Sequence, residues 1–308
     1  MASRRLSGER LGKLGVLLDR FERSFDKKVR IGFDPVELAR RQRDRADQEV
    51  AGLFASALAY GRADVFKSEL ERVLAAMGPS PAAFCDAFAR SPFPRAFENF
   101  RYRFNRPPDL AALAAGVGHV RRAYGSLGER FAELYRSARR EPQPLRRALS
   151  AFARELRGAP GVESLLRERG PRGLAHLLPD AERPGPCKRL NLYLRWMVRG
   201  PDEVDLGAWP SVPRSALIVP LDTHLARIAR YLGLTRRRDM SWRTAEEITE
   251  SLRKIDPDDP VRFDFALCHL GMSGACPVRR DEACCLACAL RASCRVGFRA
   301  GRQRQGPA

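Results

Sequence analysis

The stretch CPVRRDEACCLACALRASC, residues 276–294, is the part of the sequence that says most about the fold. Four of its cysteines follow the spacing C-x8-C-x2-C-x5-C, at Cys276, Cys285, Cys288 and Cys294. Two cysteines separated by two residues chelate well, because a short turn directs both thiolates to the same side. Four thiolates this close in sequence are the ligand set of an iron–sulfur cluster or of a structural zinc ion. The stretch therefore predicts a metal centre near the C-terminus.

The spacing favours an iron–sulfur cluster, with structural zinc as the alternative. A zinc ribbon usually repeats a second C-x2-C pair, whereas here a single cysteine follows the pair after five residues. Cys284 is adjacent to Cys285 and is an alternative ligand, but the intervals of two and five residues favour Cys285.

The composition is that of a chain that folds around an apolar core. Its 308 residues suffice for one large or two ordinary domains, and 44% of them are hydrophobic. No stretch approaches 18 consecutive apolar residues, so we expect no membrane span. The first ten residues lack the apolar core of a signal peptide, which makes the cytoplasm the expected compartment. Thiols there are more often free or bound to metal than joined in disulfides.

The net charge of +19 indicates a polyanionic partner, most often nucleic acid. The chain has 56 basic residues against 37 acidic ones, and only six of the basic residues are lysines. A GC-rich genome would explain the preference for arginine over lysine. It would not explain the surplus of cations over carboxylates.

Nearly the whole sequence has the periodicity of helices. Between residues 7 and 30, for example, Leu11, Leu14, Leu18 and Phe21 recur at three- and four-residue spacing with charges between them. No series of strands and no internal repeat is visible, so we expect an all-α fold. The expected helices cover residues 7–30, 35–45, 48–60, 64–77, 81–90, 109–123, 125–138, 143–156, 161–168, 187–199, 222–232, 243–254 and 260–270.

A second motif, Pro-Leu-Asp-Thr-His at residues 220–224, precedes the cysteines by about fifty residues. Asp222 starts a predicted helix, where its carboxylate is a good N-cap. The capping role alone would explain an aspartate at this position. The segment indicates a further, functional role only when it is considered together with the cysteines.

Together, these two motifs resemble the iron–sulfur members of the helix-hairpin-helix DNA glycosylase superfamily, endonuclease III and the adenine glycosylases. The segment from Pro220 to Ile228 is similar to the superfamily's V-D-T-H-V-x-R-[VI], and the cysteines are similar to its cluster loop, although the first interval is eight residues instead of six. The resemblance implies a two-lobed helix-hairpin-helix fold that ends in a 4Fe-4S cluster loop. It also implies that Asp222 is the catalytic carboxylate.

Bifunctional members of that superfamily carry a nucleophilic lysine in L-P-G-[VI]-G-x-K, at the start of the second helix of the hairpin. The segment from Pro184 to Asn191 resembles this motif and places Lys188 in the first turn of a helix after a Gly/Pro turn. The second glycine of the motif is missing, and Pro186 removes one backbone N–H that would otherwise bind a phosphate. Lys188 is therefore expected to be either the lyase nucleophile or a phosphate ligand.

Further residues are candidates for contact with substrate or DNA because they lie near these motifs or match positions that line the base pocket of related enzymes. Ala59-Tyr60-Gly61-Arg62 ends a predicted buried helix, and a place for Tyr60 in the core is equally compatible with the sequence. The expected contacts are Tyr60, Arg62, Gly185, Arg189, Arg195, His224, Arg279 and Arg280.

A closer resemblance, over most of the chain, is to an uncharacterised prokaryotic family with a domain of unknown function. It is carried by the segments at residues 49–62, 187–199, 220–224 and 267–274. This resemblance implies no activity, whereas the likeness to the glycosylases is specific mainly over residues 184–294.

The combined interpretation is a DNA base-excision glycosylase, with AP-lyase activity if Lys188 is the nucleophile. We expect a helical barrel domain at residues 46–201 and a second helical domain formed by residues 1–45 and 202–308, with a mobile basic tail at 295–308. We expect the protein to be a monomer that binds double-stranded DNA in the nucleoid. We expect no membrane association and no obligate protein partner. The alternative is a non-catalytic nucleic-acid-binding module that retains the glycosylase fold and the metal cluster.

Overall fold

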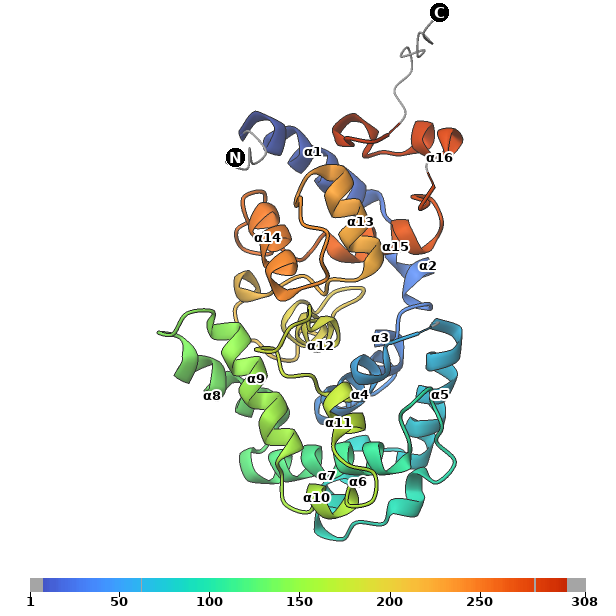
Figure 1. Cartoon of the computed structure of the whole chain (residues 1–308), viewed down its shortest axis with the longest axis vertical. Helices are drawn as coiled ribbons and strands as arrows, with labels where there is room; N and C mark the ends of the chain where they lie inside the picture. Colours follow the sequence, from blue (N-terminus) through green and yellow to red (C-terminus); the bar gives the residue numbers. More distant parts are fainter. Residues whose placement is uncertain (1–7, 62, 280, 298–308) are drawn as a thin grey trace, which may run out of the picture.

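The computed structural model describes residues 8–61, 63–279 and 281–297, and within these ranges every regular element is a helix (Figure 1). Most of the basic tail expected at 295–308 lies outside these ranges. The described residues contain no strand, and their one β-type pairing is an isolated bridge between Tyr102 and Asn105. The expected all-α fold class is confirmed. None of the described helices is both long and apolar enough to cross a membrane.

Helices from the middle of the chain gather at one end of the elongated molecule, the lower half of Figure 1. The central element is α7 (Pro107–Tyr124), which is rich in alanine and glycine. A Cβ at Gly116 or Gly118 would overlap the carbonyl oxygen of Leu156 or Cys85, so these glycines allow two neighbouring helices to pack closely on α7. The elements of this half are α4 (Arg45–Leu58), α5 (Ala63–Met77), α6 (Pro81–Arg90), η1 (Pro94–Phe97), α8 (Leu127–Ala138), α9 (Pro144–Arg157), α10 (Val162–Leu165) and α11 (Arg172–Leu177).

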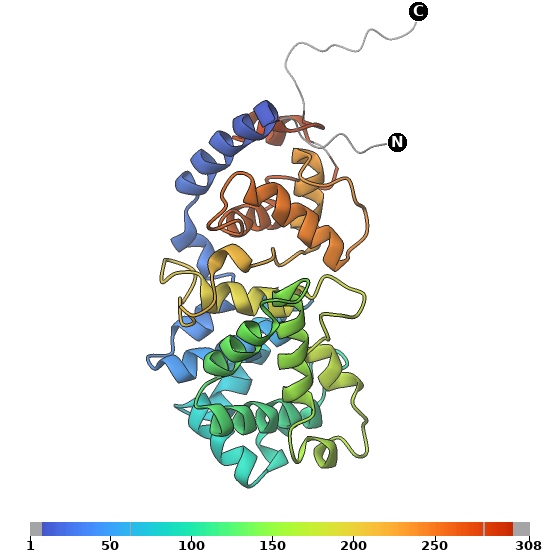
Figure 2. The same ribbon diagram turned by 90° about the vertical axis from the view of Figure 1, so that its left-hand side faces the viewer.

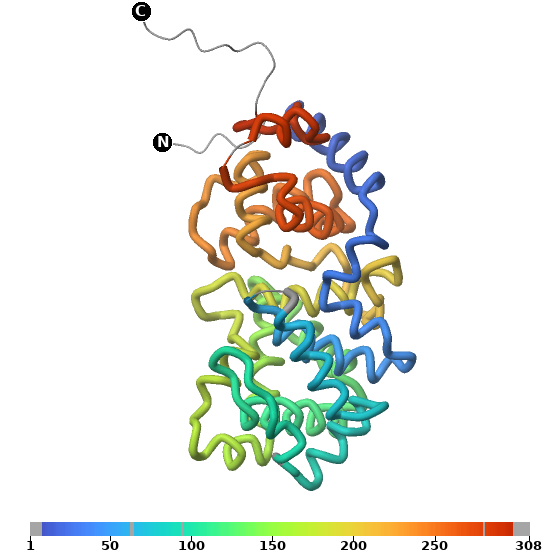
Figure 3. Tube along the Cα trace, turned by 90° about the vertical axis from the view of Figure 1, so that its right-hand side faces the viewer, coloured from blue at the N-terminus to red at the C-terminus, as the bar shows by residue number. Residues whose placement is uncertain are grey.

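The first and the last described helices lie together at the other end of the molecule. Helix α1 (Gly8–Ser24) lies beside the C-terminal segment with α16 (Glu282–Ala287) and η3 (Arg291–Ser293), as Figures 2 and 3 show in blue and red. The remaining elements of this half are η2 (Arg214–Ala216), α13 (Thr223–Leu232), α14 (Trp242–Arg253) and α15 (Asp264–Met272), while α2 (Lys27–Ile31) and α3 (Val36–Arg40) lead to the middle of the molecule.

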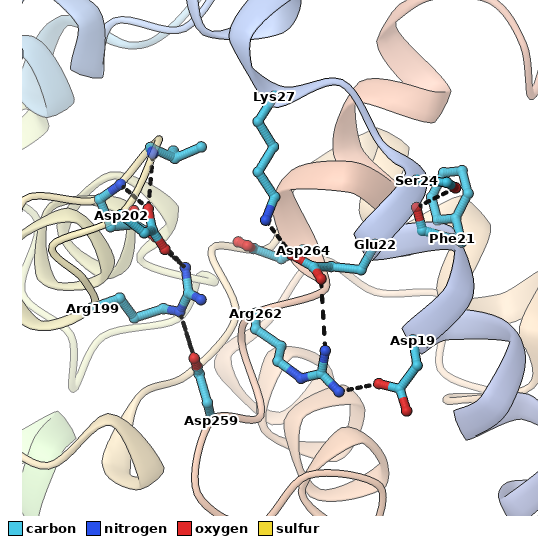
Figure 4. A network of polar contacts seen from close by, with 12 residues as sticks. Asp19, Phe21, Glu22, Ser24, Lys27, Arg199, Asp202, Asp259, Arg262 and Asp264 are labelled. Atoms are coloured by element: carbon cyan, nitrogen blue, oxygen red, sulfur yellow. Dashed lines mark hydrogen bonds and ion pairs between the residues drawn. The ribbon is translucent and has the colours of Figure 1, made fainter.

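Helix α12 (Lys188–Val198) lies between these two groups of helices (Figure 1). Its C-terminal end is held by buried charges, since Arg199 donates to Asp259 at 2.9 Å and also to Asp205. Figure 4 shows the contacts of Arg199 with Asp259 and Asp202 next to a second network, in which Arg262 contacts Asp19 of α1. Ion pairs therefore join the N-terminal helix and α12 to the loop before α15.

The helix boundaries differ from the expected ones at several places. The helices expected over 35–45 and 161–168, for example, are only Val36–Arg40 and Val162–Leu165. The helix expected over 7–30 is two helices, because Asp26 accepts a hydrogen bond from Val29 N at 3.0 Å and caps α2. The helix expected over 260–270 begins only at Asp264. Helices α11 and α16 are too short to give a periodic signal and were not expected.

Candidate functional site

A cavity of about 730 Å³ lies where the start of α12 and the start of α13 meet α15 and the end of α4. Lys188 and Asp222, which are 34 positions apart in the sequence, both line it. Its volume is within the range of sites that bind ligands of drug or cofactor size. The structure therefore brings the two expected catalytic side chains to one hollow.

Both carboxylate oxygens of Asp222 have a donor. Oδ1 accepts a hydrogen bond from the backbone N–H of Leu225 at 2.7 Å, which makes Asp222 the N-cap of α13. Oδ2 accepts one from the Cys268 thiol on α15, with Sγ and Oδ2 3.1 Å apart. The carboxylate is thus oriented by its own helix and by a neighbouring one.

Cys268 was not expected to belong to the site. Burial and the Asp222 carboxylate raise the pKa of its thiol well above the ordinary value, and the nearby Lys188 ammonium opposes this rise. A thiol that stays protonated is a hydrogen-bond donor, as the contact with Asp222 requires. Cys268 therefore lies within the electrostatic reach of both expected catalytic groups.

Lys188 is the first residue of α12, as the sequence predicted. The turn before it includes Gly185, with φ of +130°, and Cys187, which has left-handed geometry with φ of +48°. All six lysines lie in the described part of the chain, and among them Lys188 alone lines the cavity. Three others pair with carboxylates within 3 Å, namely Lys13 with Glu9, Lys27 with Glu22 and Lys67 with Glu37.

Rings and a guanidinium group form one wall of the cavity. Tyr60, at the end of α4, stacks on Phe104 with ring centroids 5.9 Å apart and meets the His176 ring edge-on at 4.7 Å. Arg189 lies over the Tyr60 ring at 5.2 Å and donates to the backbone oxygens of Ala57 and His176. Tyr60 and Arg189 thus lie in the cavity wall, as does His176, which no pattern in the sequence indicated.

Arg195, an expected DNA contact, also lines the cavity, but its guanidinium group is buried and paired with carboxylates. It is 2% exposed and forms ion pairs with Asp205 at 3.2 Å and Asp264 at 3.1 Å. A guanidinium group held between two buried carboxylates is not available to phosphates. Burial raises the pKa of Asp264 to about 7, although the Arg195 charge opposes this.

The family model described as a protein of unknown function, DUF2400, matches residues 34–273. The chain belongs to this family. No curated protein and no solved structure matches it. The DUF2400 match includes Lys188, Asp222 and Cys268, and it ends three residues before Cys276.

The other residues of this DUF2400 member that were expected to contact substrate or DNA lie in different places. Gly185 and His224 line the cavity, and the His224 ring packs where a Cβ on Gly271 of α15 would lie. Arg279 is exposed in the segment between α15 and α16, outside the cavity. Arg62 and Arg280 lie outside the described residues.

The cysteines of the C-terminal stretch share a second, smaller cavity of about 40 Å³. It is lined by the four expected ligands Cys276, Cys285, Cys288 and Cys294, and also by Cys284. Asp281 caps α16 by accepting a hydrogen bond from the backbone N–H of Cys284 at 2.8 Å. This short helix carries Cys284 and Cys285.

The described residues contain no group of three or more His, Cys, Asp or Glu side chains arranged to hold a metal ion. The donor set nevertheless fits a thiolate-bound centre, because four cysteines line one small cavity, two of them in α16 and at its C-cap. Arg227 of α13 donates to the carbonyl oxygen of Cys276 at 2.6 Å, so this cavity is linked to the helix that Asp222 caps.

Proposed function

We propose that this protein is a DNA base-excision glycosylase in which Lys188 also serves as the nucleophile of an AP-lyase reaction. One observation carries the proposal: an amine and a carboxylate, each at the first turn of a helix, line a single cavity. The net charge of +19 supports a polyanionic substrate.

In the proposed reaction, arginine side chains and helix N-termini bind phosphates, and the target nucleotide turns out of the duplex into the cavity. Asp222 stabilises positive charge on the sugar as the C1′–N bond breaks and the base leaves with the bonding electrons. The neutral Lys188 amine forms a bond to C1′ and passes one proton to the Asp222 carboxylate. The C1′–O4′ bond then breaks, O4′ takes up that proton, and the nitrogen lone pair forms the C=N bond of a protonated Schiff base. Strand cleavage by β-elimination follows. Without this attack, water adds at C1′ and the product is an abasic site.

The proposed fold is the two-lobed helix-hairpin-helix arrangement, in which the turn before Lys188 takes the place of the hairpin. Cys276, Cys285, Cys288 and Cys294 would hold a 4Fe-4S cluster that braces the C-terminal loop, with structural zinc as the alternative. Iron–sulfur charge-transfer absorbance and metal content of anaerobically purified protein separate the two: a colourless protein with one zinc per chain would reject the cluster.

Borohydride trapping on duplexes with single damaged bases tests the enzyme activity. Borohydride reduces the Schiff base to a stable amine and leaves a covalent protein–DNA adduct. We expect an adduct with the wild type and none with Lys188→Ala. Lys254→Ala is the matched control, since Lys254 is exposed at the end of α14 and lies outside the cavity.

Asp222→Asn separates catalysis from folding, because asparagine is as good an N-cap as aspartate. We expect it to lose base release while its unfolding midpoint stays close to that of the wild type. Base release without any adduct would leave a glycosylase with no lyase step. Duplex binding with neither adduct nor base release would favour a non-catalytic nucleic-acid-binding module.

A further inference from the structure

The ring cluster in the cavity wall has the properties of a site that recognises a base. His176 and Tyr60 are half-buried and line the cavity. The Phe104 ring meets the His176 ring edge-on with centroids 4.2 Å apart, and the Phe104 side chain is 46% exposed. Aromatic rings exposed beside a cavity provide a stacking surface for a planar ligand.

The contact between Arg189 and His176 fixes which ring nitrogen carries the proton. Arg189 Nη1 lies 3.3 Å from His176 Nδ1. A guanidinium group only donates, so Nδ1 must accept, and the proton of the neutral ring is on Nε2. Within the part of the chain that the structure describes, Nε2 has no hydrogen-bond partner. His176 therefore has one N–H donor left for a ligand.

The ring also resists protonation. Burial, together with the nearby guanidinium groups of Arg189 and Arg103, lowers the pKa of His176 to about 4. His176 is consequently neutral at physiological pH and keeps Nδ1 as an acceptor for Arg189. The same two positive charges oppose the entry of a cationic ligand.

We propose that His176 selects the flipped base through its Nε2–H, so that the preferred substrate is a neutral base with a carbonyl or ring-nitrogen acceptor on the edge that enters the cavity. Cationic alkylated bases are disfavoured by Arg189. This inference rests on the proposed glycosylase function and assigns the substrate class of the same cavity. The exposed Phe104 ring beside the cavity offers a stacking surface for any base, and His176 supplies the discrimination.

The test measures binding of the full-length protein to duplexes that each contain one 2′-fluoro nucleotide, since the fluorine suppresses loss of the base. The modified bases are 8-oxo-7,8-dihydroguanine, 5-hydroxyuracil and cationic 7-methylguanine, and an unmodified duplex serves as the reference. Fluorescence anisotropy gives Kd for the wild type and for His176→Phe, which keeps the ring but removes the donor. His119→Phe on α7, outside the cavity, is the matched control, and His176→Gln restores an N–H donor.

We expect the wild type to bind at least one of the two neutral oxidised bases more tightly than the unmodified and the 7-methylguanine duplexes. His176→Phe should reduce this preference roughly 3- to 10-fold without weakening the binding of unmodified duplex, as the loss of one hydrogen bond predicts. His176→Gln and His119→Phe should keep it. A wild-type preference that survives in His176→Phe, or a preference for 7-methylguanine, would overturn the assignment of His176 alone. A wild type that discriminates among none of the four duplexes, with no trapped adduct, would overturn the glycosylase proposal as well.

Discussion

Asp222 can orient a substrate only if its carboxylate is held still, and two different helices hold it. The N-cap bond to Leu225 N fixes Oδ1, while the Cys268 thiol contacts Oδ2. A thiol is a weak donor that leaves most of the negative charge on the carboxylate. Cys268 is therefore a positioning residue in the proposed reaction, and it does not need to touch the substrate.

Replacing Cys268 tests this role. Cys268→Ala should lower kcat for base release roughly 3- to 10-fold with little change in KM. The thiol holds the Asp222 carboxylate in its orientation, and its loss should cost about 1 kcal/mol of transition-state stabilisation, when positive charge develops on the sugar. Cys268→Ser should restore most of the rate, since a hydroxyl donates to the same oxygen. Single-turnover kinetics measure the effect, and Cys85→Ala at a buried cysteine outside the cavity is the control. Equal losses in the alanine and serine variants would contradict the assignment.

Motifs identified Asp222 and Lys188 from the sequence, but they could not identify Cys268 or His176. Asp222 is part of a Pro-Leu-Asp-Thr-His segment, and Lys188 follows a Gly/Pro turn, so each has a local pattern. Cys268 is defined by a partner 46 positions away, and His176 by a guanidinium group on the following helix. Arg195 lines the same cavity, but no pattern in the sequence indicated the two buried carboxylates that hold its guanidinium group.

At the scale of elements, buried charges fasten α12 to α15 and to the loop that precedes α13. Arg195 lies between Asp205 and Asp264, and Arg199 lies between Asp205 and Asp259. The carboxylates outnumber the guanidinium groups in this cluster. One buried carboxyl that retains its proton therefore reduces the repulsion. Burial raises the pKa of both Asp205 and Asp264, but Asp205 contacts two guanidinium groups and Asp264 one, so we assign the proton to Asp264, whose pKa rises to about 7.

The pH dependence of stability follows from this assignment. The Asp264 carboxyl holds a proton in the folded state up to a pH of about 7, but in the unfolded chain it loses the proton near the ordinary aspartate pKa of 3.8. The folded state thus binds more protons between these values, so the stability contributed by Asp264 is complete below about pH 4 and is lost as the pH rises to about 7. Asp264→Asn removes this ionisation, so the free energy of unfolding of the variant should decrease less as the pH rises.

Urea unfolding of the wild type and Asp264→Asn at pH 5, 6, 7 and 8 measures the effect. The difference in the free energy of unfolding should move in favour of the variant as the pH rises from 5 to 8. Asp239→Asn, at an exposed carboxyl outside this cluster, is the control and should show no such trend. A difference that stays constant over the four pH values would mean that Asp264 is ionised throughout.

The type of each long element was predictable from the sequence, whereas the contacts between elements were not. Apolar spacing predicted the long helices α7, α9 and α13 within a few residues of their observed bounds. Helix α1 packs beside η3 at the opposite end of the chain, and no periodicity within either segment indicates its partner. Packing of this kind depends on surfaces that form only after the helices do.

At the scale of the whole molecule, a chain with net charge +19 needs positive side chains close to the cavity if phosphates are to dock there. Arg183 is exposed and lines the cavity on the loop before Lys188. Binding of duplex DNA releases condensed counterions, and each phosphate contact adds roughly 0.9 to the slope of log Kd against log salt. The change in this slope when one arginine is replaced therefore reports how many phosphates that arginine contacts.

Arg183→Gln should lower this slope by roughly one contact and weaken binding of an unmodified duplex a few-fold at moderate salt. Arg140→Gln, at an equally exposed arginine after α8 and away from the cavity, should leave the slope unchanged. Anisotropy titrations between about 50 and 300 mM salt provide the comparison. Because both variants change the net charge by the same amount, a difference between them reports where the DNA lies. Two identical slopes would mean that duplex DNA binds through the general charge of the molecule, away from the loop that leads to Lys188.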